Sequence, residues 1–511
     1  MINRDLFKLS FLFIVLAELL SFFGWLVPSF NVVVFFVILF LTLVLSLKKL
    51  EYGIYVLLAE LFIGSKGYFF SFEAGETIIS IRIGLFLVVM GVWGAGVILR
   101  SLKNDEGSRG IWRALLNLNL SKNYLLLGIV ILWGFIWGII RSNNFGDVFL
   151  DFNNWLYFLL ALPIFWVVKC RDVIYDVSGD AMNRVSTKDE FIKNTLSVLA
   201  AAVTWLAIKS LILVYIFSNQ FSWALPEIYK WVRDTGVGEI TLVSGNFWRI
   251  FMQSQIFALL LFFILLMQKK KNILLISCIA IILISFSRSF WVGFVIGLAL
   301  YFILLIIQKI RLLEFFKKFA KIMLLVFLSF CLVFIVLFLP PQTKDINLGK
   351  LVGERTTQPE AASSSRINQL EPLLKEIIKH PLFGSGFGTR VTYKTDDPRI
   401  VPATAGQTGE FSTYAFEWGY LDMILKFGLV GMIVYLILIY QILRRLVNNK
   451  FQITNDKLMS NVKGQMLNVY FGFAFAIAAL LIVNIFSPYL NHPLGIGFIV
   501  ISSLIFQDYE K

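Results

Sequence analysis

Residues 9–47 read LSFLFIVLAELLSFFGWLVPSFNVVVFFVILFLTLVLSL and contain a single charged side chain, Glu18. The stretch divides into two apolar runs, 9–27 and 30–47, separated only by Pro28 and Ser29. About 20 consecutive apolar residues form a helix that crosses the roughly 30 Å hydrocarbon core of a bilayer. The stretch therefore predicts two membrane-spanning helices joined by a tight turn.

Similar runs follow along the rest of the chain. They predict further spans at 51–64, 83–99, 124–140, 153–169, 195–217, 250–267, 272–286, 290–307, 322–339, 420–441, 465–486 and 489–506. Of the 511 residues, 58% are hydrophobic and 15% are charged, whereas soluble domains average about 45–50% and 25%. We therefore expect an all-α membrane protein with about 14 transmembrane helices. The composition excludes a soluble enzyme, a nucleic-acid-binding protein and a disordered chain.

Cations concentrate in alternate connections between these spans. Lys and Arg are frequent in 100–122, 309–321 and 444–463, whereas the short connections 28–29 and 487–491 contain none. Short cytoplasmic loops carry the excess of Lys and Arg in membrane proteins. The net charge of +14 therefore reflects topology rather than a nucleic-acid partner, and both termini are expected to be cytoplasmic.

Two outer connections are long, and they divide the chain into five regions. Loops of more than about 12–15 residues are usually functional or disordered. The regions are N-terminal transmembrane helices at 1–217, an outer loop at 218–249, transmembrane helices at 250–339, a large outer loop at 340–419, and C-terminal transmembrane helices at 420–511.

The large loop contains an amphipathic helical pattern. Ser363–Ser365 are favourable N-cap residues and precede RINQLEPLLKEIIKH. The apolar side chains at 367, 370, 374, 377 and 378 fall on one face of a helix, and the charged ones lie elsewhere. A helix of this kind is expected to lie along the outer membrane surface. His380–Pro381 ends it, and LFGSGFGT follows.

Two arginines are candidates for binding an anion. Arg288 lies where two spans meet at the outer boundary, and a cation in or near a bilayer is functional by default; the alternative is an interfacial Arg that reaches water. Arg366 is expected in the first turn of the amphipathic helix, where it opposes the helix dipole unless an anion lies there. The alternative for Arg366 is a solvated loop residue.

Several other residues have two interpretations. Glu417, at the outer end of the span 420–441, suits a general base, but a structural ion pair with Lys426 or a loop arginine is favoured by spacing. Asp422 and Lys426, four residues apart, are expected to neutralise each other inside the bundle.

The spacing of Gly384, Gly386 and Gly388 fits no nucleotide-binding loop, and these residues predict a tight turn that approaches a ligand or the bundle. His380 is more simply a helix-end residue than a catalyst.

No metal centre or disulfide framework is expected. The three cysteines, Cys170, Cys278 and Cys331, have no close partners in the sequence, and His380 and His492 are the only histidines. Neither a zinc site nor a His-rich metal site fits this composition.

Three stretches, in order, resemble the O-antigen ligase and O-antigen polymerase superfamily of bacterial membrane glycosyltransferases. SRSFWVG at 287–293 is similar to the Ser-Arg start of a family span. RINQLEPLLKEIIKHPLFGSGFGT at 366–389 resembles the family's Arg-led helix that ends in a glycine-rich turn. EWGYLDMILKFGLVG at 417–431 resembles its His-Asn-x-Tyr-Leu helix, with Tyr420 at the Tyr position. WRIFMQSQIFALL at 248–260 matches a fourth, Arg-containing stretch more loosely.

The resemblance implies a GT-C-like glycosyltransferase that needs neither metal nor cofactor. Its donor is a sugar chain on undecaprenyl diphosphate, its acceptor is a glycan, and the reaction takes place at the outer face of the bacterial cytoplasmic membrane. Family arginines that match Arg288 and Arg366, and more loosely Arg249, are implied to bind the diphosphate. His380, Gly384, Gly386, Gly388 and Tyr420 are implied to line the substrate loop.

This chain departs from the ligase pattern at two positions. Glu417 stands where the ligases have the His that activates the acceptor, and Lys426 stands where the family has Glu. A carboxylate still serves as a base, so the departures favour an O-antigen or exopolysaccharide polymerase over a ligase that transfers glycan to lipid A-core. A partner that regulates chain length would then be possible.

A transporter, such as a flippase of lipid-linked oligosaccharides, is the competing class of function. Transporters place their sites near the bilayer midplane between repeated halves. Lys209, inside the span 195–217, is the residue that supports this alternative; its simpler explanation is snorkelling or a buried ion pair.

Overall fold

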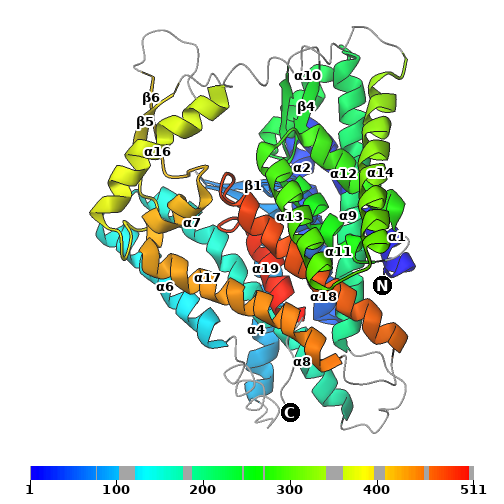
Figure 1. Ribbon diagram of the computed structural model, residues 1–511. Helices are drawn as coiled ribbons and strands as arrows, with labels where there is room; N and C mark the ends of the chain where they lie inside the picture. Colours follow the sequence, from blue (N-terminus) through cyan, green and yellow to red (C-terminus); the bar gives the residue numbers. More distant parts are fainter. Residues whose placement is uncertain are drawn as a thin grey trace.

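The computed structural model describes residues 2–75, 77–102, 121–176, 187–243, 247–268, 271–340, 361–395, 409–453 and 460–505. Helices form most of the described chain, and Figure 1 shows them in one tilted bundle. The helices of the N-terminal part are α1 (Arg4–Leu26), α2 (Pro28–Lys48), α3 (Leu50–Ile63), α4 (Ile81–Leu102), α6 (Ser121–Ile140), α7 (Phe145–Trp155), the 3-10 turn η1 (Leu156–Leu160), α8 (Ala161–Asp176) and α9 (Thr187–Ser218). Pro28 opens α2, where its missing N–H costs no intrahelical hydrogen bond.

The remaining helices complete the bundle and extend it at the top of Figure 1. They are α10 (Leu225–Asp234), the 3-10 turn η3 (Gln253–Gln255), α11 (Ile256–Leu266), α12 (Asn272–Ser285), α13 (Arg288–Ile307), α14 (Leu312–Leu337), α16 (Ala361–Lys379), α17 (Gly419–Ile453), α18 (Ser460–Val483) and α19 (Pro493–Ile505). Helix α11 is buried along nearly its whole length and packs against α12 and α18. It therefore forms the centre of the core.

Three short antiparallel hairpins accompany the helices in the described residues. They pair β1 (Ser71–Ala74) with β2 (Thr77–Ser80), β3 (Glu239–Leu242) with β4 (Trp248–Phe251), and β5 (Val391–Lys394) with β6 (Glu410–Thr413). The sequence analysis predicted none of them. The helix expected at 250–267 therefore begins later, because residues 250 and 251 belong to β4, where Arg249 lies opposite Thr241.

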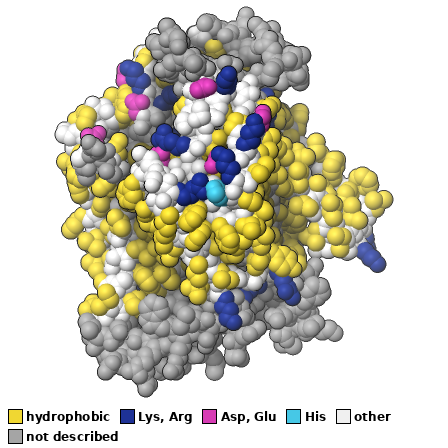
Figure 2. Space-filling view, turned by 90° about the vertical axis from the view of Figure 1, so that its left-hand side faces the viewer, with side chains coloured by type: hydrophobic (Ala, Val, Ile, Leu, Met, Phe, Trp, Pro, Cys, Tyr) yellow, Lys and Arg dark blue, Asp and Glu magenta, His cyan; other side chains and the backbone are white. Residues whose placement is uncertain are grey.

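The helices confirm an all-α, multi-pass membrane protein. The predicted apolar runs are helical, although the run 153–169 is divided among the end of α7, the 3-10 turn η1 and α8. Within the described ranges, nine helices are long and apolar enough to cross a membrane by length and composition. The others, such as Asn272–Ser285, form shorter apolar helices. Large apolar side chains are exposed along α1, α2, α6, α13 and α14. Figure 2 shows the apolar side chains as a belt, with charged side chains gathered above it.

Lys209 lies in a buried ion pair. Its ammonium contacts the carboxylate of Glu18 on α1, which also accepts a hydrogen bond from the indole N–H of Trp205. All of these contacts join α1 to α9. The buried-pair explanation of Lys209 is therefore confirmed, and Lys209 gives no support to a transport site.

Candidate active site

Arg366 and Glu417 come together at the N-terminal end of α17. The Arg366 guanidinium forms an ion pair with the Glu417 carboxylate, and their side chains are 36% and 40% exposed. Trp418, the next residue, donates from its indole N–H to the Arg366 carbonyl at 2.9 Å. These contacts hold the N-terminal part of α16 against the start of α17. The predicted ion pair of Glu417 with a loop arginine is confirmed.

The start of α16 differs from the expectation. The helix begins at Ala361, so Ser363–Ser365 lie inside it rather than before it, and Arg366 follows the first turn. Ala361 and Ala362 extend the helix because alanine has the highest helix propensity. Arg366 therefore lies beyond the first turn of α16, and its guanidinium contacts the Glu417 carboxylate.

Arg288 and Arg249 lie at a second corner of the bundle. Phe286, with a left-handed φ of 46°, ends α12, and the exposed Arg288 is the first residue of α13. The Arg249 Nε donates to the carbonyl of Ser285 at 2.8 Å, and its guanidinium lies 4.8 Å from the centroid of the Phe251 ring. The hairpin β3–β4 thus holds Arg249 against Ser285, which lies three residues before Arg288 at the end of α12.

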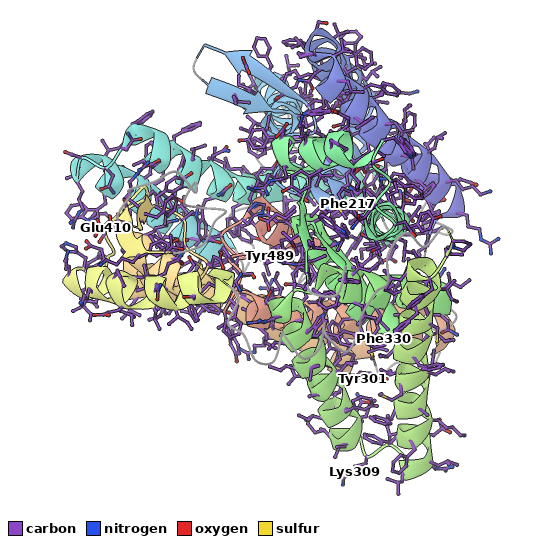
Figure 3. The ribbon with its side chains drawn as sticks, turned by 90° about the horizontal axis from the view of Figure 1, so that it is seen from above. Phe217, Tyr301, Lys309, Phe330, Glu410 and Tyr489 are labelled. Carbon is purple, nitrogen blue, oxygen red and sulfur yellow. The ribbon has the colours of Figure 1, made fainter. Side chains whose placement is uncertain are left out.

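The connection between α18 and α19 joins these two corners. Phe486 packs against Trp418 with ring centroids 5.8 Å apart, and the next residue, Ser487, lies 3.0 Å (Oγ to Oγ) from Ser289. Glu417 and Arg288 are the sequence neighbours of Trp418 and Ser289. Figure 3 shows Tyr489, from the same connection, between the part of the molecule that holds α16 and α17 and the part that holds α13. The α18–α19 connection therefore contacts both Trp418, the residue after Glu417, and Ser289, the residue after Arg288.

The glycine-rich turn approaches the bundle rather than open solvent. Gly384, Gly386 and Gly388 all have positive φ and are buried. A Cβ on Gly386 would lie 2.4 Å from the backbone nitrogen of Gly138 on α6, and one on Gly388 would lie 2.7 Å from that of Val148 on α7. Only glycine allows this approach. The turn is therefore a wedge between α6, α7 and α17.

The wedge also repairs a break in α17. Gly428 is non-helical (φ 72°, ψ −177°). The amides of Leu429 and Val430 donate instead to the carbonyls of Pro381 and Leu382, at 2.9 and 3.2 Å. Backbone groups inside a membrane protein need such internal partners.

His380 precedes this turn, and its carbonyl accepts from Gly384 at 3.0 Å. Tyr420 points into the bundle, where its hydroxyl donates to the Leu481 carbonyl at 2.8 Å.

A buried charge cluster lies beneath the wedge. The Lys426 ammonium is 2.6 Å from Asp151 on α7 and 2.9 Å from Asp422, and Asp151 also accepts from the Gly388 amide at 2.9 Å. Asn491 donates to Asp422 at 2.5 Å. The expected pairing of Asp422 with Lys426 is confirmed. The cluster ties the glycine wedge to α7, α17 and the α18–α19 connection.

Lys426→Met is expected to destabilise the protein strongly. The substitution leaves two buried carboxylates without their cation, and breaking a buried pair costs about 3–5 kcal/mol. The free energy of unfolding in detergent measures the loss. Lys375→Met is the matched control, because Lys375 pairs with Glu371 where both side chains are exposed and such a pair contributes about 0–1 kcal/mol. Equal stability of the two variants would contradict the role of the cluster.

Sequence reasoning missed Asp147, Asp151 and Arg390. Arg390 donates to Asp147 from Nε at 2.5 Å and from a terminal nitrogen at 3.1 Å, and this contact raises the pKa of the guanidinium. Burial, followed by the charges of Asp151 and Asp147, raises the pKa of the nearby Tyr414 hydroxyl. The available signal was the pair of aspartates, four residues apart, directly before an apolar run.

Comparison with known proteins agrees with this arrangement. The sequence model of a family described as O-antigen ligase matches residues 273–436, which include Arg288, Arg366 and Glu417. No curated protein matches the chain in sequence. The match confirms the resemblance and supports a membrane glycosyltransferase that uses a lipid-linked glycan donor and a glycan acceptor. Residues 273–436 of the chain are therefore similar to the family described as O-antigen ligase.

Proposed function

We propose that this protein transfers a glycan from undecaprenyl diphosphate to the hydroxyl of an acceptor sugar at the outer face of the cytoplasmic membrane. The contact between Arg366 and Glu417 carries the proposal, since it brings a cation for the diphosphate and a carboxylate for the acceptor to one place. Arg288 and Arg249, across the α18–α19 connection, supply further positive charge for the same diphosphate.

Donor binding would exchange the partners of Arg366. The ion pair with Glu417 is partly exposed, and pairs of that kind contribute about 0–1 kcal/mol. Charge-assisted hydrogen bonds to phosphate contribute roughly 1.5–3 kcal/mol each, and Arg binds phosphate in a bidentate manner. The diphosphate therefore displaces Glu417 from Arg366, so that the carboxylate becomes available only when the donor is bound.

The reaction then needs one proton transfer and one displacement. The acceptor hydroxyl gives its proton to Glu417, and its oxygen attacks the anomeric carbon of the donor sugar with inversion. The bond from that carbon to the diphosphate oxygen breaks, and undecaprenyl diphosphate leaves with the electron pair. The arginines stabilise the charge that develops on the leaving phosphate.

We infer a polymerase, in which the acceptor is another lipid-linked chain. Glu417 stands in place of the ligase His, and Lys426 is committed to the buried cluster with Asp151 and Asp422. The reaction at this carboxylate therefore departs from the ligase pattern. A ligase that transfers to lipid A-core is the second candidate, because the matching family is described as O-antigen ligase.

One incubation distinguishes these functions. Purified protein in proteoliposomes receives the undecaprenyl-diphosphate-linked repeat unit without another acceptor, and the products are resolved on a gel. A polymerase gives a ladder with regular spacing. Product that forms only after lipid A-core is added indicates the ligase. A donor that stays intact both without and with lipid A-core would contradict glycosyl transfer and favour transport.

A further inference from the structure

Helix α16 has three different faces. Ser365, Gln369, Leu373 and Ile377 recur every four residues and are buried against β5 and α17, with Val391, Phe416 and Leu425 in the same small core. Glu371, Lys375 and Lys379 form an exposed charged flank. The third face is apolar and exposed, which is unusual for a helix that already has a buried face.

We define the outward stripe as Ile367, Leu374 and Ile378, together with Leu382 and Phe383 after the helix. Ile367 and Ile378 are 67% and 73% exposed, and the other three are also exposed within the part of the chain that the structure describes. The spacings of seven and four residues place the three helical members on one line along α16. A soluble surface rarely keeps a continuous apolar line of this kind without a partner.

The stripe continues into a surface that faces lipid. Trp133 on α6 donates to the Phe383 carbonyl at 3.1 Å, and the two rings lie 5.9 Å apart; Trp133 also stacks on Trp137. Helix α6 is one of the candidate spans, and its exposed residues from Leu125 to Ile140 are apolar. Tryptophan is typical of the level at which a membrane meets water.

We propose that the outward stripe of α16 docks into the outer leaflet of the membrane that α6 crosses. Figure 1 shows the end of α16 beside the end of α6, and Figure 2 shows charged side chains directly above the apolar belt on this side. The charged flank with Lys375 and Lys379 then faces the headgroups and water, while the stripe faces the acyl chains, as in interfacial amphipathic helices.

Docking would fix the depth of Arg366, the proposed diphosphate-binding residue, relative to the membrane surface. Arg366 lies on α16 one residue before Ile367, and Trp418 holds its carbonyl. A helix held in the interface keeps this guanidinium near the level of lipid phosphates. This consequence rests on the proposed function, whereas the docking itself rests only on the surface of α16 and α6.

Site-directed spin labelling tests the docking without measuring activity. With Cys170, Cys278 and Cys331 replaced by Ser, a nitroxide is attached to Ile378→Cys, and in a second variant to Lys375→Cys on the charged flank of the same turn. Both native side chains are strongly exposed, so the labels disturb no core. Vesicles contain phosphatidylethanolamine and phosphatidylglycerol, and collisions with oxygen and with nickel-EDDA are compared.

The label at 378 is expected to collide several-fold more often with oxygen than with nickel-EDDA, and the label at 375 is expected to show the reverse. Equal, water-like values at both positions would overturn the proposal. An immobilised label at 378 that neither reagent reaches would also overturn it and would indicate coverage by protein, such as a second copy of the chain. Leu374→Cys provides a second test on the stripe if the first variant fails to fold.

Discussion

Arg366→Ala is expected to abolish glycan transfer while the protein remains folded. The side chain is partly exposed and contacts Glu417 at the edge of the bundle, so its removal leaves no buried charge unpaired. If Arg366 binds the diphosphate, the variant loses a hydrogen-bonding cation that stabilises the charge on the leaving phosphate. Loss of one such group typically lowers kcat by about 10²–10³-fold. Consumption of lipid-linked donor in proteoliposomes measures the effect.

The control for Arg366→Ala lies on the same helix. Lys375→Ala removes a cation from an exposed pair with Glu371 and should retain full turnover. Binding of the donor should weaken in the Arg366 variant alone, so that KM rises as kcat falls. Activity equal to that of the wild type in Arg366→Ala would remove this residue from the donor site and leave it with a structural role.

Glu417→Gln is expected to separate binding from chemistry. Glutamine has nearly the same shape but accepts no proton, and loss of a general base lowers kcat by about 10²–10⁴-fold. The neutral side chain competes less for Arg366, so donor affinity should stay the same or increase by up to about fivefold. A fall in kcat without a rise in KM is the expected result.

Glu371→Gln provides the comparison for Glu417→Gln, because Glu371 is an exposed carboxylate on α16 with an ion-pair partner of its own. It should retain normal kinetics. If Glu417→Gln retains substantial turnover, the carboxylate serves only to hold α16 against α17. Weaker donor binding in this variant would contradict the proposed exchange of partners at Arg366.

The sequence was sufficient for the membrane fold because hydrophobic length reports directly on bilayer thickness. The apolar runs are helical over most of their length, and Asp422 pairs with Lys426 as their spacing predicted. Local charge spacing was also enough to suggest a partner for Glu417 among the loop arginines. The first two of these inferences depend on residues that are near one another in the sequence.

Long-range contacts were beyond the reach of the sequence. Asp151 meets Lys426 across 275 residues, and Gly386 approaches Gly138 on α6. A glycine pattern indicates a close approach but does not name the surface approached. The N-terminus of α16 was misplaced because three serines suggested a cap, whereas the preceding alanines continue the helix.

The most direct test of the central claim is the ratio of undecaprenyl diphosphate released to glycosidic bonds formed. Wild-type protein, Arg366→Ala and Glu417→Gln are incubated with the same lipid-linked repeat unit in proteoliposomes, and both products are quantified by mass spectrometry. Transfer at this site predicts one diphosphate lipid per new bond in the wild type and neither product above background in the variants. Wild-type vesicles that move the donor across the bilayer intact, with no diphosphate lipid released, would contradict the account.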